Sequence, residues 1–158
     1  MPALTKTGWF LCEVKSWGIR EAKETQSVSV TLKLETRAEW DGTQWVEAMP
    51  LDVFGDFYFI GKDGQVLRPA LENLTKANLW RGEGLMLYDN DPEPGLHVVV
   101  QVGTNIYNGK TTYRAEWVYH VDHKPGAGGI ANRASRERLM ELEAKTGAMI
   151  RAALPTPF

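Results

Sequence analysis

The chain has 158 residues, of which 43% are hydrophobic and 24% are charged, and its formal net charge is −2. This length and composition indicate one globular domain with a tail, and the slightly acidic balance excludes a uniformly basic nucleic-acid-binding protein. The single cysteine, Cys12, excludes an internal disulfide framework. We expect a cytoplasmic protein, because the sequence shows no charged-then-apolar leader and no long apolar run.

The first half of the chain predicts three strands. Residues 8–20 form the first, and residues 27–38 form the second, where apolar and polar residues alternate as in a strand with one buried face. A hairpin turn then leads to a third strand over residues 43–60. Pro50 and Gly55 interrupt this strand and predict a bulge or an edge.

The second half begins with a change of period. Residues 66–80 space their leucines as a helix does, and Pro69 suits the first turn of that helix. Residues 96–104 and 111–122 predict two more strands, joined by a tight turn at Asn108-Gly109. Five strands with a helix between the third and fourth is the order of a five-stranded Greek-key barrel, the OB-fold, so the predicted fold is mainly β.

We predict three segments in the chain. Residues 1–123 form the barrel domain, residues 124–131 form a Gly-rich linker, and residues 132–158 form an amphipathic helix with a tail. The apolar stripe of the terminal helix suits docking on the barrel, on a second copy in a homo-oligomer, or on a partner protein.

Basic and aromatic residues gather on the faces that alternation leaves exposed. Cations pair with phosphates, and flat rings stack on unpaired bases, a contact worth about 1–3 kcal/mol per base whatever the sequence. Interleaved rings and cations suit single strands better than duplexes. The residues predicted to bind nucleic acid are Lys15, Trp17, Arg20, Lys33, Arg37, Trp40, Trp45, Tyr107, Lys110 and Arg114. The alternative is that these rings fill the barrel or pack loops, as we expect for Phe10, Phe54 and Trp117.

Other titratable residues lack the spacing that catalysis or metal binding requires. His120 and His123 are three apart on a predicted strand and so point to opposite faces, which favours solvated or hydrogen-bonded roles. The acidic run at residues 89–94 contains two prolines, Pro92 and Pro94, and lacks the other ligands of a calcium loop. Asp52 and Asp56 have no nucleophile or base arranged around them. We therefore expect a protein that is not an enzyme and has no metal or cofactor.

Four segments resemble those of a known family: the opening GWFLCEV, the strand VSVTLKLE, the helix leading into NLWRG, and the hairpin YNGKTTYRAEWV. The family is that of small phage-encoded OB-fold single-stranded DNA-binding proteins, including phage domains of unknown function of this type. The resemblance spans residues 8–122 and depends on pattern and element order. It implies sequence-independent coating of single strands in phage DNA replication, recombination or repair, in the host cytoplasm and without a cofactor.

The ends of such proteins suggest a further partner. Many of them finish with an acidic tail capped by an aromatic residue that recruits replication or recombination proteins. This chain ends in Pro157-Phe158 without the preceding acids. Two other classes stay open: a structural or protein-interaction barrel, such as a virion component or a host-protein inhibitor, and a carbohydrate-binding barrel. No membrane partner is expected.

Overall fold

The computed structural model describes residues 2–125 and 136–153. The chain divides into two units, residues 1–125 and residues 126–158. The predicted linker from residue 126 onward and the terminal Pro157-Phe158 lie outside the described residues. Within the described ranges, no helix combines the length and the apolar character needed to cross a bilayer.

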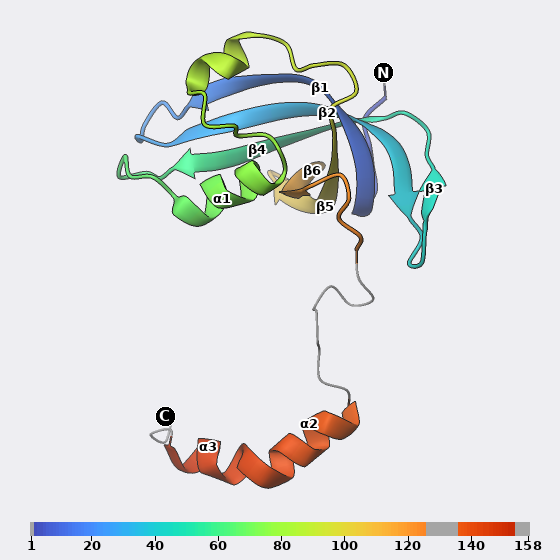
Figure 1. The fold of residues 1–158 in the computed structure, drawn as a ribbon, viewed down its shortest axis with the longest axis vertical. Coiled ribbons are helices and arrows are strands. Elements are labelled where there is room, and N and C mark those ends of the chain that lie inside the picture. Colours follow the sequence, from blue (N-terminus) through green and yellow to red (C-terminus); the bar gives the residue numbers. More distant parts are fainter. Residues whose placement is uncertain (1, 126–135, 154–158) are drawn as a thin grey trace. The chain divides into compact units, whose positions relative to one another are not determined.

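Six strands form one sheet in the first unit: β1 (Gly8–Glu21), β2 (Val28–Trp40), β3 (Trp45–Glu47), β4 (Asp52–Ile60), β5 (His97–Tyr107) and β6 (Lys110–Tyr119). The strand order is β1-β5-β6-β4-β2-β3, and β1 also pairs with β2, so the five longer strands close into a barrel (Figure 1). The β4–β6 pair is parallel and the other pairs are antiparallel. This topology confirms the predicted OB-type barrel.

The alternation in β2 explains where the core lies. Val30, Leu32 and Leu34 are fully buried, while the alternate residues Lys33 and Glu35 are only half-buried. Because successive side chains point to opposite faces of a strand, one face of β2 fills the barrel and the other faces outward. The predicted half-buried strand is therefore confirmed.

The predicted third strand is divided in two. It breaks around Pro50, which lies between β3 and β4, as the missing backbone N–H of proline predicts. Gly55, in contrast, does not interrupt β4. A Cβ at Gly55 would lie 2.9 Å from the carbonyl oxygen of Ala115 and 2.8 Å from the Phe57 ring. Glycine is therefore required for β4 to approach β6 closely enough to close the barrel.

The helix α1 (Arg68–Lys76) lies where the sequence predicts it, with Pro69 in its first turn. Its Leu74 side chain is 2% exposed and belongs to the core, and the Asn73 side chain donates from Nδ2 to the carbonyl oxygen of Val118 at 3.0 Å. α1 therefore packs against β4 and β6 at one end of the barrel. The loop that follows contains a short 3-10 helix, η1 (Leu85–Asp89), which the sequence pattern did not predict.

Two bulges change which side chains face the core. In β1 the register shifts between Val14 and Ser16, which places Trp17 opposite the buried Leu32 and against the core. Strict alternation had placed Trp17 on the exposed side with Lys15. A bulge inserts one unpaired residue, and every later side chain then changes face.

The second bulge has the opposite effect on another tryptophan. In β6 the register shifts around Glu116, so that Ala115 and Val118 are both buried and Trp117 is 55% exposed. Phe54 is also exposed, at 44%, because it lies opposite Lys33 on the outward side of β2. The expectation that Trp117 and Phe54 are core residues is therefore wrong, whereas that for Phe10, 2% exposed, is confirmed.

The second unit is a helix over its described residues. It consists of α2 (Arg136–Leu142), a π-helical turn (Glu143–Gly147) and α3 (Ala148–Ala153). Arg151 pairs with Glu143 at 2.5 Å, which links the last turn to the π-helical segment. Leu139, Met149 and Ile150 are exposed apolar residues. The predicted terminal helix is thus confirmed over the described residues.

Candidate nucleic-acid interface

Five of the six predicted cations fall into two groups on the outer face of the barrel, and the sixth, Lys110, lies at the tip of the β5–β6 hairpin. In the first group, Arg37 donates to the carboxylates of Glu13 and Glu35, and the Nζ of Lys15 lies 3.8 Å from Glu13. The hydrogen bond from Arg37 lowers the pKa of Glu13, and the same contact raises the pKa of Arg37. Two carboxylates thus balance two cations, and this part of the face carries no surplus positive charge.

The second group lies where β1, β2, β4 and β6 meet. The Nη2 of Arg114 lies 2.5 Å from one oxygen of Asp56, and the Nη1 of Arg20 lies 3.6 Å from the other. The Thr31 hydroxyl also donates to Asp56. One carboxylate therefore serves two guanidinium groups. Lys33, opposite Phe54 in the β2–β4 register, has no ion-pair partner among the described residues. Glu116 lines a hollow with Asp56 and Arg114, so three cations face two carboxylates in this region.

Exposed rings lie in this second region. Phe54 and Tyr58 are on the outward side of β4, exposed at 44% and 49%, and Trp117 is on β6. The sequence interpretation missed all three as site residues. A signal was present for β4, because the alternation in DVFGDFYFI places Phe54, Asp56 and Tyr58 on one side. No such signal existed for Trp117, since its orientation depends on the bulge.

Hollows in the surface meet around Tyr58. A polar hollow of about 380 Å³ is lined by Asp56, Tyr58, Thr104, Asn105, Arg114, Ala115 and Glu116. A mainly apolar pocket of about 420 Å³ shares Asp56, Tyr58 and Glu116 with it and continues to α1. A third hollow, of about 420 Å³, is lined by Tyr58, Lys62 and Leu67 among others and extends to the loop between β1 and β2. Tyr58 is therefore the ring that all three share.

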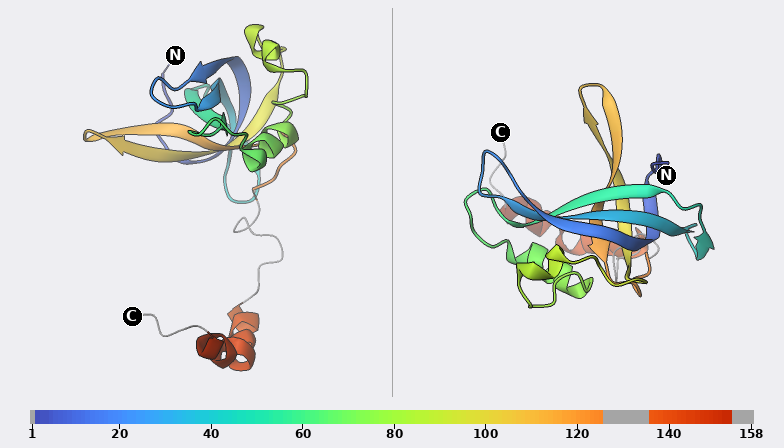
Figure 2. Two further views of the ribbon diagram at one scale, coloured as in Figure 1. Left: turned by 90° about the vertical axis from the view of Figure 1, so that its left-hand side faces the viewer. Right: turned by 90° about the horizontal axis from the view of Figure 1, so that it is seen from above.

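The β5–β6 hairpin adds two predicted site residues at its tip. Tyr107 and Lys110 are register partners on either side of the turn, and the Tyr107 side chain is 75% exposed. Figure 2 shows this hairpin projecting from the body of the barrel. Asn108 has φ of 52° and Gly109 has φ of 76°, which is the left-handed geometry that the Asn-Gly turn predicts.

The three predicted tryptophans have packing partners outside this region. The Trp17 indole donates from Nε1 to the carbonyl oxygen of Asn90 at 2.5 Å and meets Tyr88 edge-on, with ring centroids 5.0 Å apart. Trp40 and Trp45 pack edge-on against each other at 5.2 Å across the β2–β3 hairpin. Trp40 lies seven residues beyond Lys33 along β2, which corresponds to about 23 Å of strand. The fold does not bring these rings next to Tyr58.

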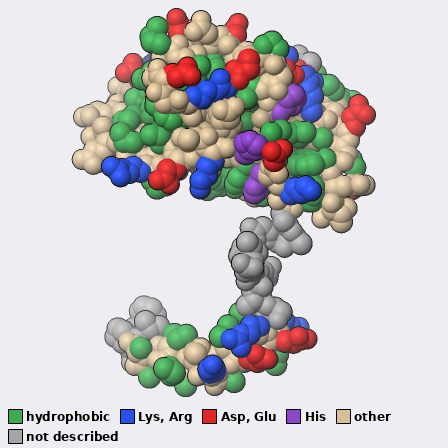
Figure 3. All heavy atoms as spheres, viewed as in Figure 1, with side chains coloured by type: hydrophobic (Ala, Val, Ile, Leu, Met, Phe, Trp, Pro, Cys, Tyr) green, Lys and Arg blue, Asp and Glu red, His purple; other side chains and the backbone are tan. Residues whose placement is uncertain are grey.

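Charges and histidines elsewhere on the barrel show local structural contacts. Figure 3 shows basic and acidic side chains interspersed on the barrel face that it displays. The Nδ1 of His120 accepts from the backbone N–H of Asp122 at 3.0 Å, as expected for a hydrogen-bonded role. His123 stacks on Tyr119 with centroids 4.2 Å apart, and burial lowers its pKa. The described residues contain no group of three or more potential ligands that could hold a metal ion.

No protein-family model matches this chain, and a search of curated proteins returns no match. The candidate interface therefore depends on geometry and chemistry alone: exposed rings on β4 and β6, surrounding cations, and a projecting hairpin.

Proposed function

We propose that this protein binds single-stranded DNA without sequence preference, on the outer face of β4 and its neighbouring strands, in phage DNA replication, recombination or repair. The observation that carries the proposal is the exposure of Phe54, Tyr58 and Trp117 beside Arg20, Lys33 and Arg114. Rings and cations in alternation suit a strand whose bases are unpaired, since bases stack and phosphates pair with cations.

The proposed site differs from the one that the sequence predicts. Of the residues predicted from the sequence to bind nucleic acid, it keeps Arg20, Lys33, Tyr107, Lys110 and Arg114. It omits Arg37 and Lys15, whose two charges are balanced by Glu13 and Glu35, and the packed tryptophans Trp17, Trp40 and Trp45. It adds the rings of Phe54, Tyr58 and Trp117.

Titration of the protein into a labelled dT strand of about 12 nucleotides, a length within the range of one OB-fold, tests this function. We expect saturable binding to the single strand and at least tenfold weaker binding to the matching duplex. With three to four phosphate contacts, the slope of log affinity against log salt should be about −2 to −3. Equal affinity for single strand and duplex, or an affinity that does not change with salt, contradicts the proposal.

The alternative function, a structural or protein-interaction barrel, is favoured by one observation. Val66, Leu67 and Met86 are exposed apolar residues near α1 and η1, at 54%, 39% and 73%. Exposed apolar side chains of this kind anchor protein contacts. The same titration separates the two functions, because a protein-interaction barrel does not bind the dT strand.

A further inference from the structure

The pocket beside α1 arises from the way the barrel closes. β4 and β6 pair only at Phe54 and Arg114. Beyond this bridge the two strands separate, and α1 packs into the gap without filling it. The remaining pocket has a volume of about 420 Å³ and opens next to Tyr58. Its position makes it continuous with the proposed DNA-binding face.

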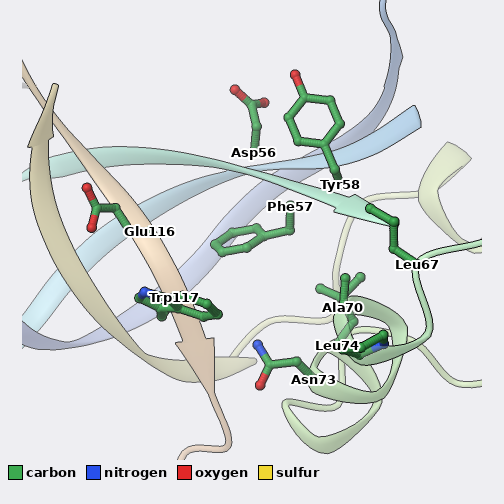
Figure 4. Close-up of a pocket in the computed structure, with 10 residues that line it drawn as sticks. Asp56, Phe57, Tyr58, Leu67, Ala70, Asn73, Leu74, Glu116 and Trp117 are labelled. Atoms are coloured by element: carbon green, nitrogen blue, oxygen red, sulfur yellow. The ribbon is translucent and has the colours of Figure 1, made fainter. Parts of the chain in front are cut away.

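The walls of the pocket are flat rings and small apolar groups. Figure 4 shows Trp117 of β6 and Phe57 of β4 on one side, with Ala70 and Leu74 of α1 on the other. The carboxylates of Asp56 and Glu116 point away from α1 in this view. The interior thus has a ring suited to stacking and lacks a charged group directed toward α1.

One polar group lines the pocket at its α1 side. The amide of Asn73 donates from Nδ2 to the carbonyl oxygen of Val118 at 3.0 Å. A carbonyl oxygen only accepts, so this contact fixes which end of the amide is nitrogen. The remaining N–H and the Oδ1 of Asn73 have no hydrogen-bond partner among the described residues. An amide with one free donor and one free acceptor matches the donor–acceptor edge of a nucleobase, as in asparagine–adenine pairs.

We infer that this pocket receives one base of the bound strand, which stacks on Trp117 and hydrogen-bonds along its edge to Asn73. This inference rests on the proposed function. It differs from stacking on Phe54 and Tyr58, because the base leaves the row of its neighbours and enters a hollow between strand and helix. An apolar side chain of a partner protein is the competing occupant, and it would leave the Asn73 amide unused.

The test compares a pocket-filling variant with a control on the same helix. Ala70→Phe places a ring in the pocket, whereas Thr75→Phe adds the same ring at an exposed position of α1 outside it. Each protein is titrated with a dT strand of about 12 nucleotides and with copies of that strand carrying one abasic position each. Wild type and Thr75→Phe should lose about 5- to 150-fold in affinity at the position that enters the pocket.

In Ala70→Phe, the intact strand should bind more weakly and the loss at that one abasic position should disappear. Losses at the positions that stack on Phe54 and Tyr58 should remain. Trp117→Ala should behave like Ala70→Phe, and Trp117→Phe should restore most of the affinity, which keeps the test valid if Ala70→Phe does not fold. Unfolding midpoints of each variant serve as the folding control.

Failure of the base pocket and failure of the proposed function are distinguishable. The inference is overturned if Ala70→Phe binds the intact strand and every abasic strand as wild type does. It is also overturned if a protein partner, and no base, occupies the pocket. If wild type itself binds no intact strand, the proposed function fails, and the inference fails with it. If wild type binds the intact strand, and each abasic position costs the same affinity in all variants, the proposed function stands and the base pocket is rejected.

Discussion

Strands β1 and β6 each contain a bulge, and the two bulges orient their tryptophans in opposite ways. The β1 bulge turns Trp17 toward the core, where its indole N–H is bonded to Asn90 and its ring contacts Tyr88. The β6 bulge turns Trp117 outward, where more than half of it is exposed. One inserted residue in each strand therefore decides whether an indole packs against the core or faces outward. Substitutions at Trp17 should therefore change the stability of the barrel, whereas substitutions at Trp117 should change binding to the proposed DNA strand.

The largest expected difference is in stability. Trp17→Ala should lower the free energy of unfolding by about 3 kcal/mol, because it removes a packed ring and its hydrogen bond. Trp117→Ala should lower it by less than about 1 kcal/mol, as an exposed ring contributes little. Urea denaturation of both variants measures the two values. Equal losses would mean that the bulges do not separate the two roles.

Glycines near the two bulges give the next largest effect. Gly55→Ala should cost about 2 kcal/mol, because its Cβ would lie within 3 Å of the Ala115 carbonyl oxygen where β4 meets β6. Gly18→Ala, on β1 just after its bulge, is the matched control: no described atom lies within 4 Å of its Cβ, so the change should be neutral or slightly stabilising. Thermal unfolding of both proteins measures this, and a Gly55→Ala protein as stable as wild type would contradict the close approach.

The two groups of cations should differ in their effect on binding. Lys33→Gln should reduce the magnitude of the salt slope for a dT strand by about 0.7, the value for one phosphate contact on a single strand. Arg37→Gln should leave the slope unchanged, because Arg37 is already paired with Glu13 and Glu35. It should instead cost about 0.5–1 kcal/mol of stability, since those two carboxylates are register partners and would repel each other.

A pH dependence of stability is also expected at Tyr88, whose ring contacts Trp17. Burial raises the pKa of Tyr88 from 10.0 to about 12, and its hydroxyl donates to the carbonyl oxygen of Leu79. A raised folded-state pKa means that this contribution to stability is complete below pH 10 and is lost as the pH rises toward 12. Tyr88→Phe should therefore flatten the fall in stability between these pH values. An unchanged slope in the variant would argue against a buried, neutral phenol.

The fold follows from the sequence more completely than the site does. Regular alternation in β2, the Asn108-Gly109 turn and the leucine spacing of α1 are local patterns, and each leads to the element found there. The break at Pro50 is equally local. The need for glycine at position 55 comes from a long-range contact with β6, which no neighbour in sequence reveals.

The orientation of the rings depends on features that alternation cannot supply. A bulge changes the face of every later residue, so the counts that place Trp17 outside and Trp117 inside were reliable only up to Val14 and Glu116. Ion pairs are also non-local: Arg37 meets Glu13 across two strands, and Arg114 meets Asp56 across the barrel closure. The sequence identifies the cations, but only the fold shows that Lys15 and Arg37 face an equal number of carboxylates, whereas Arg20 and Arg114 share a single one.

Photo-cross-linking tests the central claim most directly, because it reports where a strand lies. A dT strand with a single 5-iodouracil is bound to the full chain and irradiated, and the cross-linked peptides are mapped by mass spectrometry. We expect cross-links at Phe54, Tyr58 and Trp117. In Tyr58→Ala, the cross-link from the nucleotide that stacks on Tyr58 should be lost. Cross-links confined to Trp40, Trp45 or the second unit, with none on β4 or β6, would contradict this account.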